Sequence, residues 1–312
     1  MKKSLLKSPR SRKNPCILLT GSTGFLGSHI LKALIEMNFD VIILKRTTSD
    51  TSRIKNQLEK GKVYNVDCTD FTTIFSESNV DIVINTVCSF GRKSESTTDV
   101  VNTNLLFSLT LLEAAVKHNV KTFINTDSLL SRNVNSYTLS KSQFVEWLQF
   151  FSEKIQVVNL RIEHIYGPGD DVKKFLPWLV DQMLNSDQDV SLTSGIQKRD
   201  FIYIYDVIAA YMLVIKKRTT LSSKWSEFHV ATNSFVAVKD VILIIASELE
   251  RRRKLDITSR LKFGTIPYRP NDSMKPSNNN NSLIELGWSP SVSVNEGIIK
   301  YVNDLLDSDN KI

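Results

Sequence analysis

The chain has 312 residues, of which 41% are hydrophobic and 23% charged, and its net charge is +7. This length and composition are typical of a soluble globular protein with a sizeable core. No apolar run approaches the roughly 18 residues of a membrane span. The three cysteines, Cys16, Cys68 and Cys88, lack metal-ligand spacing. We therefore expect a cytoplasmic protein with free thiols, no metal site and no membrane partner.

Two basic clusters contribute to the positive charge. Residues 1–14 are basic and lack the apolar stretch of a secretory signal, so we expect a disordered extension. The second cluster is Arg251 to Lys254. Basic proteins bind nucleic acids or small polyanions such as nucleotides. No RNA- or DNA-binding motif accompanies either cluster, so solvated faces are favoured and no nucleic-acid partner is expected.

Short apolar runs alternate with helical patterns through the first half of the chain. Strands are predicted at 16–20, 41–44, 62–66, 81–86, 121–126 and 155–160, and the clearest helices at 25–37, 99–118 and 137–154. This alternation is typical of βαβ units with right-handed crossovers and a parallel sheet covered on both faces. The predicted fold class is α/β: a Rossmann doubly wound parallel sheet with a smaller C-terminal α/β substrate lobe.

The regular alternation of predicted strands and helices ends after Gly167. Helices are predicted at 175–185, 238–252, 283–286 and 294–306, a strand joined to a helix at 200–217, and a late strand at 228–231. The predicted NADP-binding Rossmann domain is 15–166, to which a strand and helix near 200–235 return. The predicted substrate-binding lobe is 167–199 with 236–312.

A glycine-rich turn joins the first strand to the first helix. Glycine at 21 permits a tight turn, glycine at 24 lets the backbone approach a pyrophosphate, and glycine at 27 lets the helix pack against the strand. The helix N-terminus offers N–H groups and a positive dipole end to the anion. The predicted cofactor contacts in this turn are Gly21, Thr23, Gly24, Phe25, Leu26 and Gly27.

The ends of the next two strands bear on the choice of dinucleotide. NAD-preferring enzymes usually place an acidic residue after the second strand, but Lys45 and Arg46 stand here. They favour NADP, whose 2′-phosphate they could bind; the alternative is a solvent-facing basic pair. Asp67, followed by Cys68, could accept a bond from the adenine amine or be an N-cap or turn residue.

Tyr137 and Lys141 lie four residues apart at the start of a predicted helix, so both lie on one face. A nearby ammonium should lower the phenol pKa, which suits general acid–base catalysis. Ser128 lies at the carboxyl end of the preceding strand, where open α/β sheets bind ligands, and could bond a substrate oxygen. The alternative for the pair is an exposed helix face.

These motifs, with Arg161 to Asp170, the segment Gly195 to Tyr203 and the run Arg269 to Asp272, resemble an extended short-chain dehydrogenase/reductase of the nucleotide-sugar epimerase/dehydratase family. Within it, Asn125 to Ser128 and Arg161 to Asp170 are most similar to CDP-abequose and CDP-paratose synthases. Those enzymes reduce a nucleotide-linked 4-keto sugar with NADPH. The resemblance therefore implies deoxysugar biosynthesis for surface polysaccharide, including lipopolysaccharide O-antigen.

The resemblance implies roles for individual residues. Tyr137 would pass a proton to the C4 oxygen, Lys141 would lower the tyrosine pKa and hold the nicotinamide ribose, and Ser128 would polarise the ketone. The cofactor would also contact Thr86, Val87, Asn104, His164 and Ile165, and the substrate Cys88, Ser128, His164, Arg199 and Arg269, with the two arginines on its pyrophosphate. A homodimer through helices near 99–118 and 137–154 is also implied.

The chain departs from the family pattern in places. Only eight residues separate Ser128 from Tyr137, which makes Thr126 a rival for the serine role. Cys88 replaces a small residue, and His164 stands where many relatives have asparagine; it lines the substrate pocket or is a hydrogen-bonded interior residue. His29, His118 and His229 are expected to be structural.

Several functions remain open from the sequence. The favoured one is an NADPH-dependent nucleotide-sugar 4-ketoreductase. The runner-up is a nucleotide-sugar 4-epimerase with tightly bound NAD, which uses the same Ser128, Tyr137 and Lys141. A dehydratase is disfavoured because no Glu follows Asp127. A non-catalytic NADP-sensing protein is disfavoured because the three residues are kept, and a nucleic-acid binder rests on charge alone.

Overall fold

The computed structural model describes residues 14–92, 94–268 and 273–309. Its centre is a seven-stranded sheet whose neighbouring strands are all parallel. In spatial order the strands are β10 (Trp225–Val230), β6 (Gln156–Ile162), β5 (Thr122–Ser128), β4 (Ile82–Asn85), β1 (Cys16–Thr20), β2 (Asp40–Lys45) and β3 (Lys62–Asn65). The order reverses between β1 and β4, and open α/β sheets bind ligands at such a switch point. The predicted doubly wound Rossmann sheet is confirmed.

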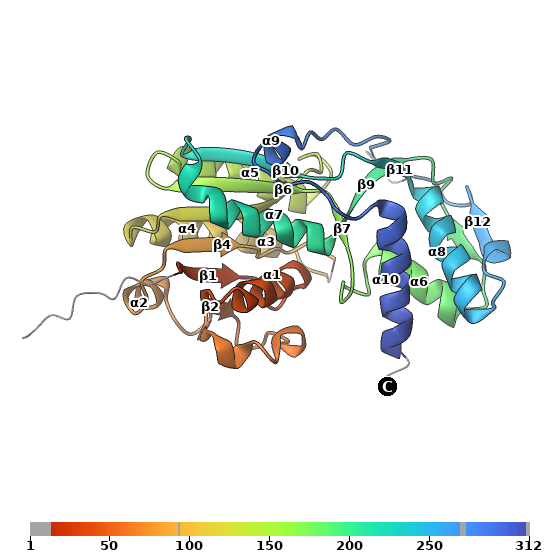
Figure 1. Ribbon diagram of the computed structural model, residues 1–312, viewed down its shortest axis with the longest axis horizontal. Helices are drawn as coiled ribbons and strands as arrows, with labels where there is room; N and C mark the ends of the chain where they lie inside the picture. Colours follow the sequence, from red (N-terminus) through yellow and green to blue (C-terminus); the bar gives the residue numbers. More distant parts are fainter. Residues whose placement is uncertain (1–13, 93, 269–272, 310–312) are drawn as a thin grey trace, which may run out of the picture.

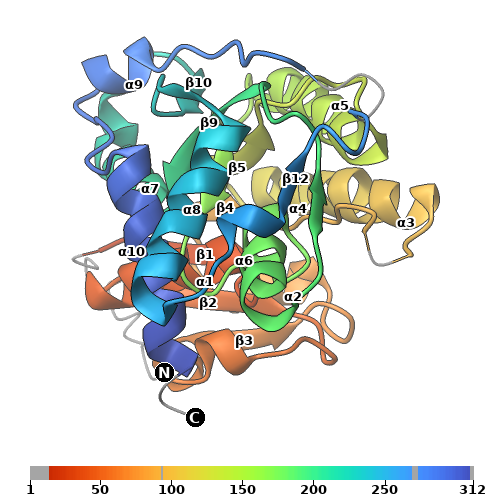
Figure 2. The ribbon, with the colours of Figure 1, turned by 90° about the vertical axis from the view of Figure 1, so that its right-hand side faces the viewer.

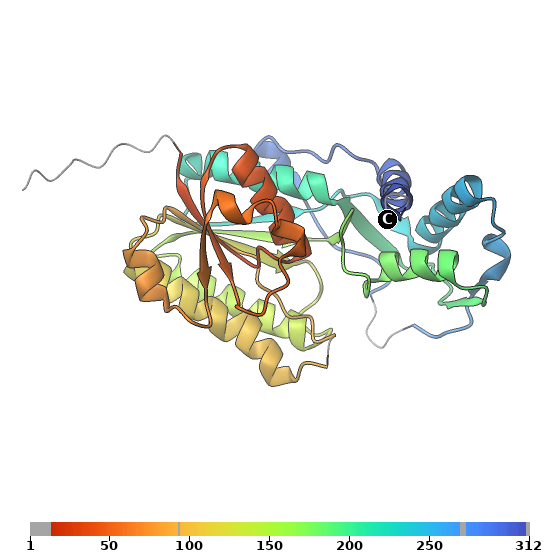
Figure 3. The ribbon, with the colours of Figure 1, turned by 90° about the horizontal axis from the view of Figure 1, so that it is seen from below.

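Helices cover both faces of this sheet (Figure 3). One face carries α1 (Phe25–Glu36) and α7 (Ile204–Lys217), and the other carries α2 (Phe71–Ser76), α4 (Phe107–Lys117) and α5 (Ser136–Phe151). Because both faces are covered, β1 and β4 are buried at every position. Their near-continuous apolar sequences follow from that burial.

The helix before β5 is longer than α4 alone. It begins with α3 (Thr97–Val101), widens through one π-helical turn, η3 (Asn102–Leu106), and continues as α4. By length and hydropathy, residues 97–117 are the one stretch of the described chain that could cross a membrane. One face of this stretch nevertheless packs in the core, where Leu111, Leu112 and Ala115 are buried. The absence of a membrane partner stays a prediction.

A second group of elements lies beyond the carboxyl ends of the strands (Figures 1 and 2). It has a three-stranded sheet of β11 (Phe235–Ala237), β9 (Lys198–Tyr203) and β7 (His164–Tyr166), and a two-stranded one of β12 (Leu261–Phe263) and β8 (Val190–Leu192). Its helices are α6 (Phe175–Asn185), α8 (Val238–Arg253) and α10 (Val294–Asp309), and they share a separate apolar core. The short helix α9 (Asn281–Glu285) packs against β10.

Four 3₁₀ turns complete the described elements: η1 (Ser52–Ile54), η2 (Leu58–Lys60), η4 (Arg218–Thr220) and η5 (Thr258–Arg260). The helices predicted in the second half of the chain are present, some shifted by one to three residues. Strands β7, β8, β11 and β12 were not expected. Each has only three residues, and a run that short has no readable periodicity.

Candidate functional site

The glycine turn lies at the sheet's switch point, between β1 and α1. Gly21 has a φ of +65°, and a Cβ there would come within 2.5 Å of the Thr86 Oγ1. A Cβ at Gly27 would collide with the Gly21 carbonyl oxygen, so the helix can pack this closely only on glycine. Gly24 is the N-cap of α1 and has no side chain to cap the helix. The first N–H groups of α1 are therefore available to an anion, which fits a dinucleotide pyrophosphate.

Lys45 and Arg46, the basic pair at the end of β2, have different surroundings. The Lys45 ammonium donates to the Asn65 Oδ1 at 2.9 Å and to the Arg46 carbonyl at 3.3 Å, so it ties β2 to β3. The Arg46 side chain is exposed, and its backbone N–H is held by the Ser49 hydroxyl at 3.0 Å. Arg46 is thus better placed than Lys45 to meet a 2′-phosphate.

Asp67 is committed to the neighbouring loop. Both its carboxylate oxygens lie 3.0 Å from the Thr47 backbone nitrogen, and it also accepts from the Thr47 hydroxyl, which holds the pKa of Asp67 below its usual range. Asp67 therefore joins the loops after β2 and β3, the turn role that the sequence left open. Cys68 beside it is exposed.

Asn104 holds the loop after β4. Its side chain is fully buried in the π-helical turn, accepts from the Ser89 N–H at 2.8 Å, and donates to the Ser89 carbonyl at 2.9 Å and the Ser140 hydroxyl at 3.1 Å. These bonds fix the loop containing Thr86, Val87 and Cys88 against α5. Asn104 therefore supports the rim of the candidate cofactor site, with its side-chain bonds taken up by protein atoms.

Ser128 and Tyr137 meet at the carboxyl end of β5, as predicted. The Tyr137 hydroxyl is in hydrogen-bond contact with Ser128 and with the Cys88 thiol. The Ser128 Oγ also accepts from the Leu130 N–H at 3.2 Å, which aims it from the loop. The short loop between the two residues is therefore long enough to bring them together. Thr126, the rival, instead shares a 2.6 Å hydrogen bond with the Tyr211 hydroxyl.

The prediction that the pKa of Tyr137 is lowered is wrong. Burial raises the pKa of Tyr137 well above its ordinary value, and Cys88 and Asp127 add to this, while the Ser128 hydrogen bond and Arg92 oppose it. Lys141 is buried and its charge instead lowers the pKa of Cys88, which burial nonetheless raises to about 11. For Tyr137, desolvation outweighs the Ser128 hydrogen bond and the charge of Arg92, because burial disfavours the charged phenolate.

Three residues that the sequence did not single out complete the site's rim. The Phe90 ring lies 4.9 Å from the Tyr137 ring, and the Arg92 guanidinium lies 5.2 Å from the centre of Phe90. The Lys174 ammonium lies 5.0 Å from the centre of the Phe25 ring and pairs with Asp170 at 2.7 Å. All three residues lie in loops, where the sequence has no periodic pattern from which these contacts could be predicted.

Charged groups run behind Ser128 along the strand ends. Asp127 pairs with the Arg161 Nε at 3.3 Å, and the Arg161 Nη1 lies 3.4 Å from Glu227. The neighbouring His229, whose Nε2 lies 3.9 Å from the carboxylate, is the main cause that lowers the pKa of Glu227 to about 2, helped by Asn159 and Arg161. Asp127 helps to raise the pKa of Tyr137, so this cluster also acts on the candidate active site.

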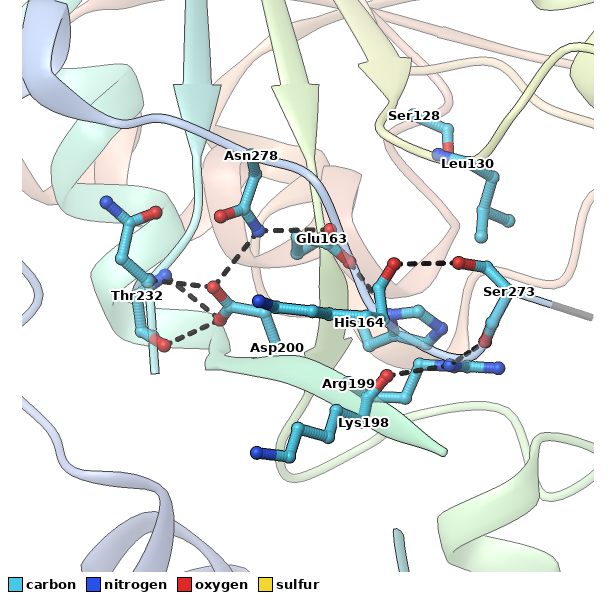
Figure 4. Close-up of polar contacts among 12 residues, drawn as sticks. Ser128, Leu130, Glu163, His164, Lys198, Arg199, Asp200, Thr232, Ser273 and Asn278 are labelled. Atoms are coloured by element: carbon cyan, nitrogen blue, oxygen red, sulfur yellow. Dashed lines mark hydrogen bonds and ion pairs between the residues drawn. The ribbon is translucent and has the colours of Figure 1, made fainter. Parts of the chain in front are cut away.

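A second polar cluster lies where β7 and β9 meet the segment that contains Asn278 (Figure 4). The Asn278 amide donates to Glu163 and to Asp200, both at 3.1 Å, and so bridges two carboxylates. His164 bonds Glu163 through its Nδ1 at 2.9 Å and is half-buried. Burial raises the pKa of Asp200, although bonds from Thr232 oppose the shift. His164 is thus a hydrogen-bonded residue, which is one of the two roles that the sequence left open.

The predicted pyrophosphate arginines have different outcomes. The Arg199 Nη1 donates to the Ser273 carbonyl at 2.6 Å and to the Lys198 carbonyl at 2.7 Å, so Arg199 fastens the segment that leads to Asn278 (Figure 4). Arg269 lies outside the described residues. Ile165 is half-buried in β7, packs on the core beneath α1 and α7, and pairs with Ile202. In the described ranges, no cluster of three or more His, Cys, Asp and Glu residues could hold a metal ion.

The parallel sheet, its glycine turn and the Ser128–Tyr137 pair define a dinucleotide-binding α/β protein. Residues 17–225 match the model of the NAD dependent epimerase/dehydratase family. The chain belongs to this family, as the resemblance of its motifs predicted.

Individual relatives cover nearly the whole chain. CDP-abequose synthase of Salmonella typhimurium is 30% identical over 301 residues, which cover 93% of this chain and 98% of that protein. The UDP-glucose 4-epimerase of Thermotoga maritima has a TM-score of 0.79 at 22% identity, covering 94% of this chain and 99% of the other. The UDP-glucuronic acid 4-epimerase of Bacillus cereus, solved with UDP-glucuronic acid and NAD, has a TM-score of 0.78 at 20% identity, with the same coverage. These two structures support the fold alone.

Proposed function

We propose that the protein is an NADPH-dependent reductase of the C4 keto group of a nucleotide-diphospho-4-keto-6-deoxyhexose, CDP- or dTDP-linked, in deoxysugar biosynthesis. The observation that carries the proposal is the Tyr137 hydroxyl, buried against Ser128 with a raised pKa. A phenol that stays protonated at neutral pH can act as a general acid, which a ketone reduction needs. The relation to CDP-abequose synthase supports the same substrate class.

The proposed reduction adds a hydride to C4 and a proton to the C4 oxygen. When bound, the reduced dinucleotide supplies the hydride that forms the new C–H bond at C4. Ser128 donates a hydrogen bond to the C4 oxygen, and Tyr137 transfers its proton to that oxygen as the carbonyl becomes an alcohol. The tyrosinate then regains a proton from solvent. Lys141, buried one helical turn after Tyr137, holds a positive charge near the phenolate while it exists.

The proposed cofactor fits the turn between β1 and α1. The pyrophosphate would lie against the N–H groups of α1, beside a turn whose close packing on Thr86 and on α1 requires glycine at 21 and 27. Arg46 and Lys45 would meet the 2′-phosphate of NADPH, a role that the absence of an acidic residue at the end of β2 supports. NAD is the alternative, and the Bacillus cereus neighbour contains it.

The substrate would lie over the cluster around His164 and Arg199. These side chains belong to β7 and β9, which lie beyond the carboxyl ends of the main sheet. The Arg199 guanidinium, which also donates to the Lys198 and Ser273 carbonyls, is proposed to contact the diphosphate together with Arg269. Cys88 would lie on the opposite rim, beside Tyr137.

We further propose a homodimer through the helices that cover β4 and β5. Four apolar side chains project into solvent there: Leu106, Leu139, Trp147 and Phe150. Phe150 is 64% exposed, and it contacts the edge of Trp147 at 6.1 Å between ring centres. Aromatic side chains exposed together on one surface are typical of protein–protein interfaces.

The decisive experiment mixes the protein with NADPH and a panel of CDP-, dTDP-, GDP- and UDP-4-keto-6-deoxyhexoses. Loss of nicotinamide absorbance with formation of a C4 alcohol, assigned by NMR, is expected for one of them. Tyr137→Phe should abolish this turnover while NADPH binding persists. Interconversion of C4 epimers without NADPH loss would replace the proposal with the epimerase, and retained turnover in Tyr137→Phe would exclude the proton donor.

A further inference from the structure

A row of polar side chains crosses the hydrophobic sheet at one level. Its members come from five adjacent strands, β1, β4, β5, β6 and β10, and are direct cross-strand partners. They are Thr20, Asn85, Asn125, Asn159 and Glu227, and the first four are fully buried. Apart from its last member, this row lies where a parallel sheet normally has apolar side chains.

Each side chain in this polar row bonds the next. The Thr20 hydroxyl donates to the Asn85 Oδ1 at 2.9 Å, and Asn85 donates to the Asn125 Oδ1 at 3.3 Å. Asn125 donates to the Asn159 Oδ1 at 2.8 Å, and Asn159 donates to the Glu227 carboxylate at 3.0 Å. All four bonds point the same way, from the cofactor end of the sheet towards β10.

Glu227 dictates that direction. A carboxylate can only accept hydrogen bonds, so Asn159 must turn its amide NH₂ towards Glu227 and its oxygen towards Asn125. The same constraint passes along the row until the Thr20 hydroxyl must donate to Asn85. Glu227 is held ionised by its neighbours, since His229, Asn159 and Arg161 lower its pKa to about 2.

The other end of the row lies at the candidate cofactor site. Because the Thr20 hydroxyl donates its hydrogen bond to Asn85, its Oγ1 can accept from the Thr86 N–H, at 3.2 Å. The Thr86 hydroxyl in turn donates to the Thr20 carbonyl at 2.7 Å. Thr86 also touches the Gly21 turn, where there is no room for a Cβ. In a reversed row the Thr20 proton would have only the Ile84 carbonyl at 3.5 Å as its next acceptor.

We infer that Glu227 is a positioning residue for dinucleotide binding, which acts through the polar row to fix Thr20 and Thr86 against the Gly21 turn. This inference rests on the proposed use of a dinucleotide, but not on the identity of the sugar. Buried hydrogen-bonded chains strengthen cooperatively, and a half-satisfied chain is costly, so the two ends should be coupled.

The test is a double-mutant cycle read by dinucleotide affinity. Glu227→Gln keeps the shape of residue 227, but its amide accepts or donates, so the direction of the row is no longer imposed. Thr20→Val removes the hydroxyl, and Thr20→Ser restores it. NADPH and NAD⁺ are titrated in parallel without any sugar, and the thermal unfolding midpoint reports on folding.

Glu227→Gln and Thr20→Val should each weaken binding about fivefold or more, the usual lower range of coupling between sites. The double variant should bind like Thr20→Val alone, within about twofold. Thr20→Ser should bind like the wild type. Glu285→Gln is the matched control: it makes the same substitution at an exposed residue of α9, which packs against β10 but lies outside the row, and it should leave affinity within about twofold.

Independent, additive effects of Glu227→Gln and Thr20→Val would overturn the inference, as would unchanged affinity in Glu227→Gln. An equal loss in Glu285→Gln would also overturn it, because the effect would then come from removing a negative charge near β10 and not from the row. The two proposals can fail separately. If the cycle is non-additive but the protein reduces none of the 4-keto sugars, the role of Glu227 is supported and only the proposed reaction is contradicted.

Discussion

The Phe90 ring lies 4.9 Å from the Tyr137 ring, with the two planes tilted by 49°. Phe90 comes from the loop after β4 and Tyr137 from α5, so the contact joins the candidate cofactor rim to the candidate proton donor. The ring shields the phenol from water on that side, and shielding is the main reason why the pKa of Tyr137 is raised. Phe90 therefore bears on both the position and the acidity of Tyr137.

Phe90→Ala should lower kcat/KM about tenfold, because a misplaced catalytic group loses much of its rate advantage. It should also lower the pKa of Tyr137, since water would reach the hydroxyl and the desolvation that raises the pKa would shrink. Spectroscopic titration of tyrosinate and steady-state kinetics measure the two effects. Phe90→Tyr keeps the ring and should retain wild-type kinetics; an equal loss in Phe90→Tyr would show that ring packing is not the cause.

The raised pKa of Tyr137 predicts the pH dependence of reduction. A general acid must be protonated, and a pKa well above 10 keeps the phenol protonated through neutral and mildly alkaline pH. The rate of ketone reduction at saturating NADPH should therefore stay flat from about pH 6 to about pH 9 and fall only at higher pH. An alkaline decline centred near neutral pH would mean that the phenol ionises far earlier than its burial implies.

The sequence was sufficient for the sheet and the glycine turn because both depend on local patterns. Apolar runs and helical spacing identify each βαβ unit by itself. The Tyr137 and Lys141 spacing likewise places them on one helix face whatever the rest of the chain does. Ser128 could be placed because it lies at the carboxyl end of a predicted strand.

Contacts between distant segments could not be read in the same way. The asparagines of β4, β5 and β6 are visible in the sequence, but only strand register shows that Asn85, Asn125 and Asn159 stand side by side. The Tyr137 pKa was expected to fall because Lys141 is near in sequence. Burial, which depends on the whole fold, reversed that expectation.

Cofactor selectivity should depend more on Arg46 than on Lys45. Arg46 is exposed at the end of β2, whereas the Lys45 ammonium bonds Asn65. A hydrogen bond to a charged group contributes about 1.5–3 kcal/mol, so Arg46→Ala should weaken NADPH binding about tenfold or more. The dissociation constant of NADH should hardly change, because it lacks the 2′-phosphate.

Fluorescence titration of both cofactors measures this selectivity. Lys55→Ala is a suitable control, because Lys55 is exposed and its loss changes the net charge by the same amount. Equal weakening of NADPH and NADH by Arg46→Ala would argue that Arg46 does not recognise the 2′-phosphate.

Asn104→Ala should both destabilise the fold and impair the site. The side chain makes three hydrogen bonds, two to the backbone of Ser89 and one to Ser140. Removing it leaves buried polar partners unsatisfied, at a cost of about 1–3 kcal/mol for each group that water cannot reach. Chemical denaturation should therefore show a loss of about 2–4 kcal/mol in the free energy of unfolding.

The loop from Thr86 to Ser89 would also lose its anchor on α5, so dinucleotide affinity should fall with stability. Asn102→Ala is the matched control, since Asn102 lies in the same π-helical turn but is exposed. It should change the free energy of unfolding by less than about 0.5 kcal/mol. If Asn104→Ala lost stability but bound the dinucleotide normally, the loop would owe its position to other contacts, such as those between Thr20 and Thr86.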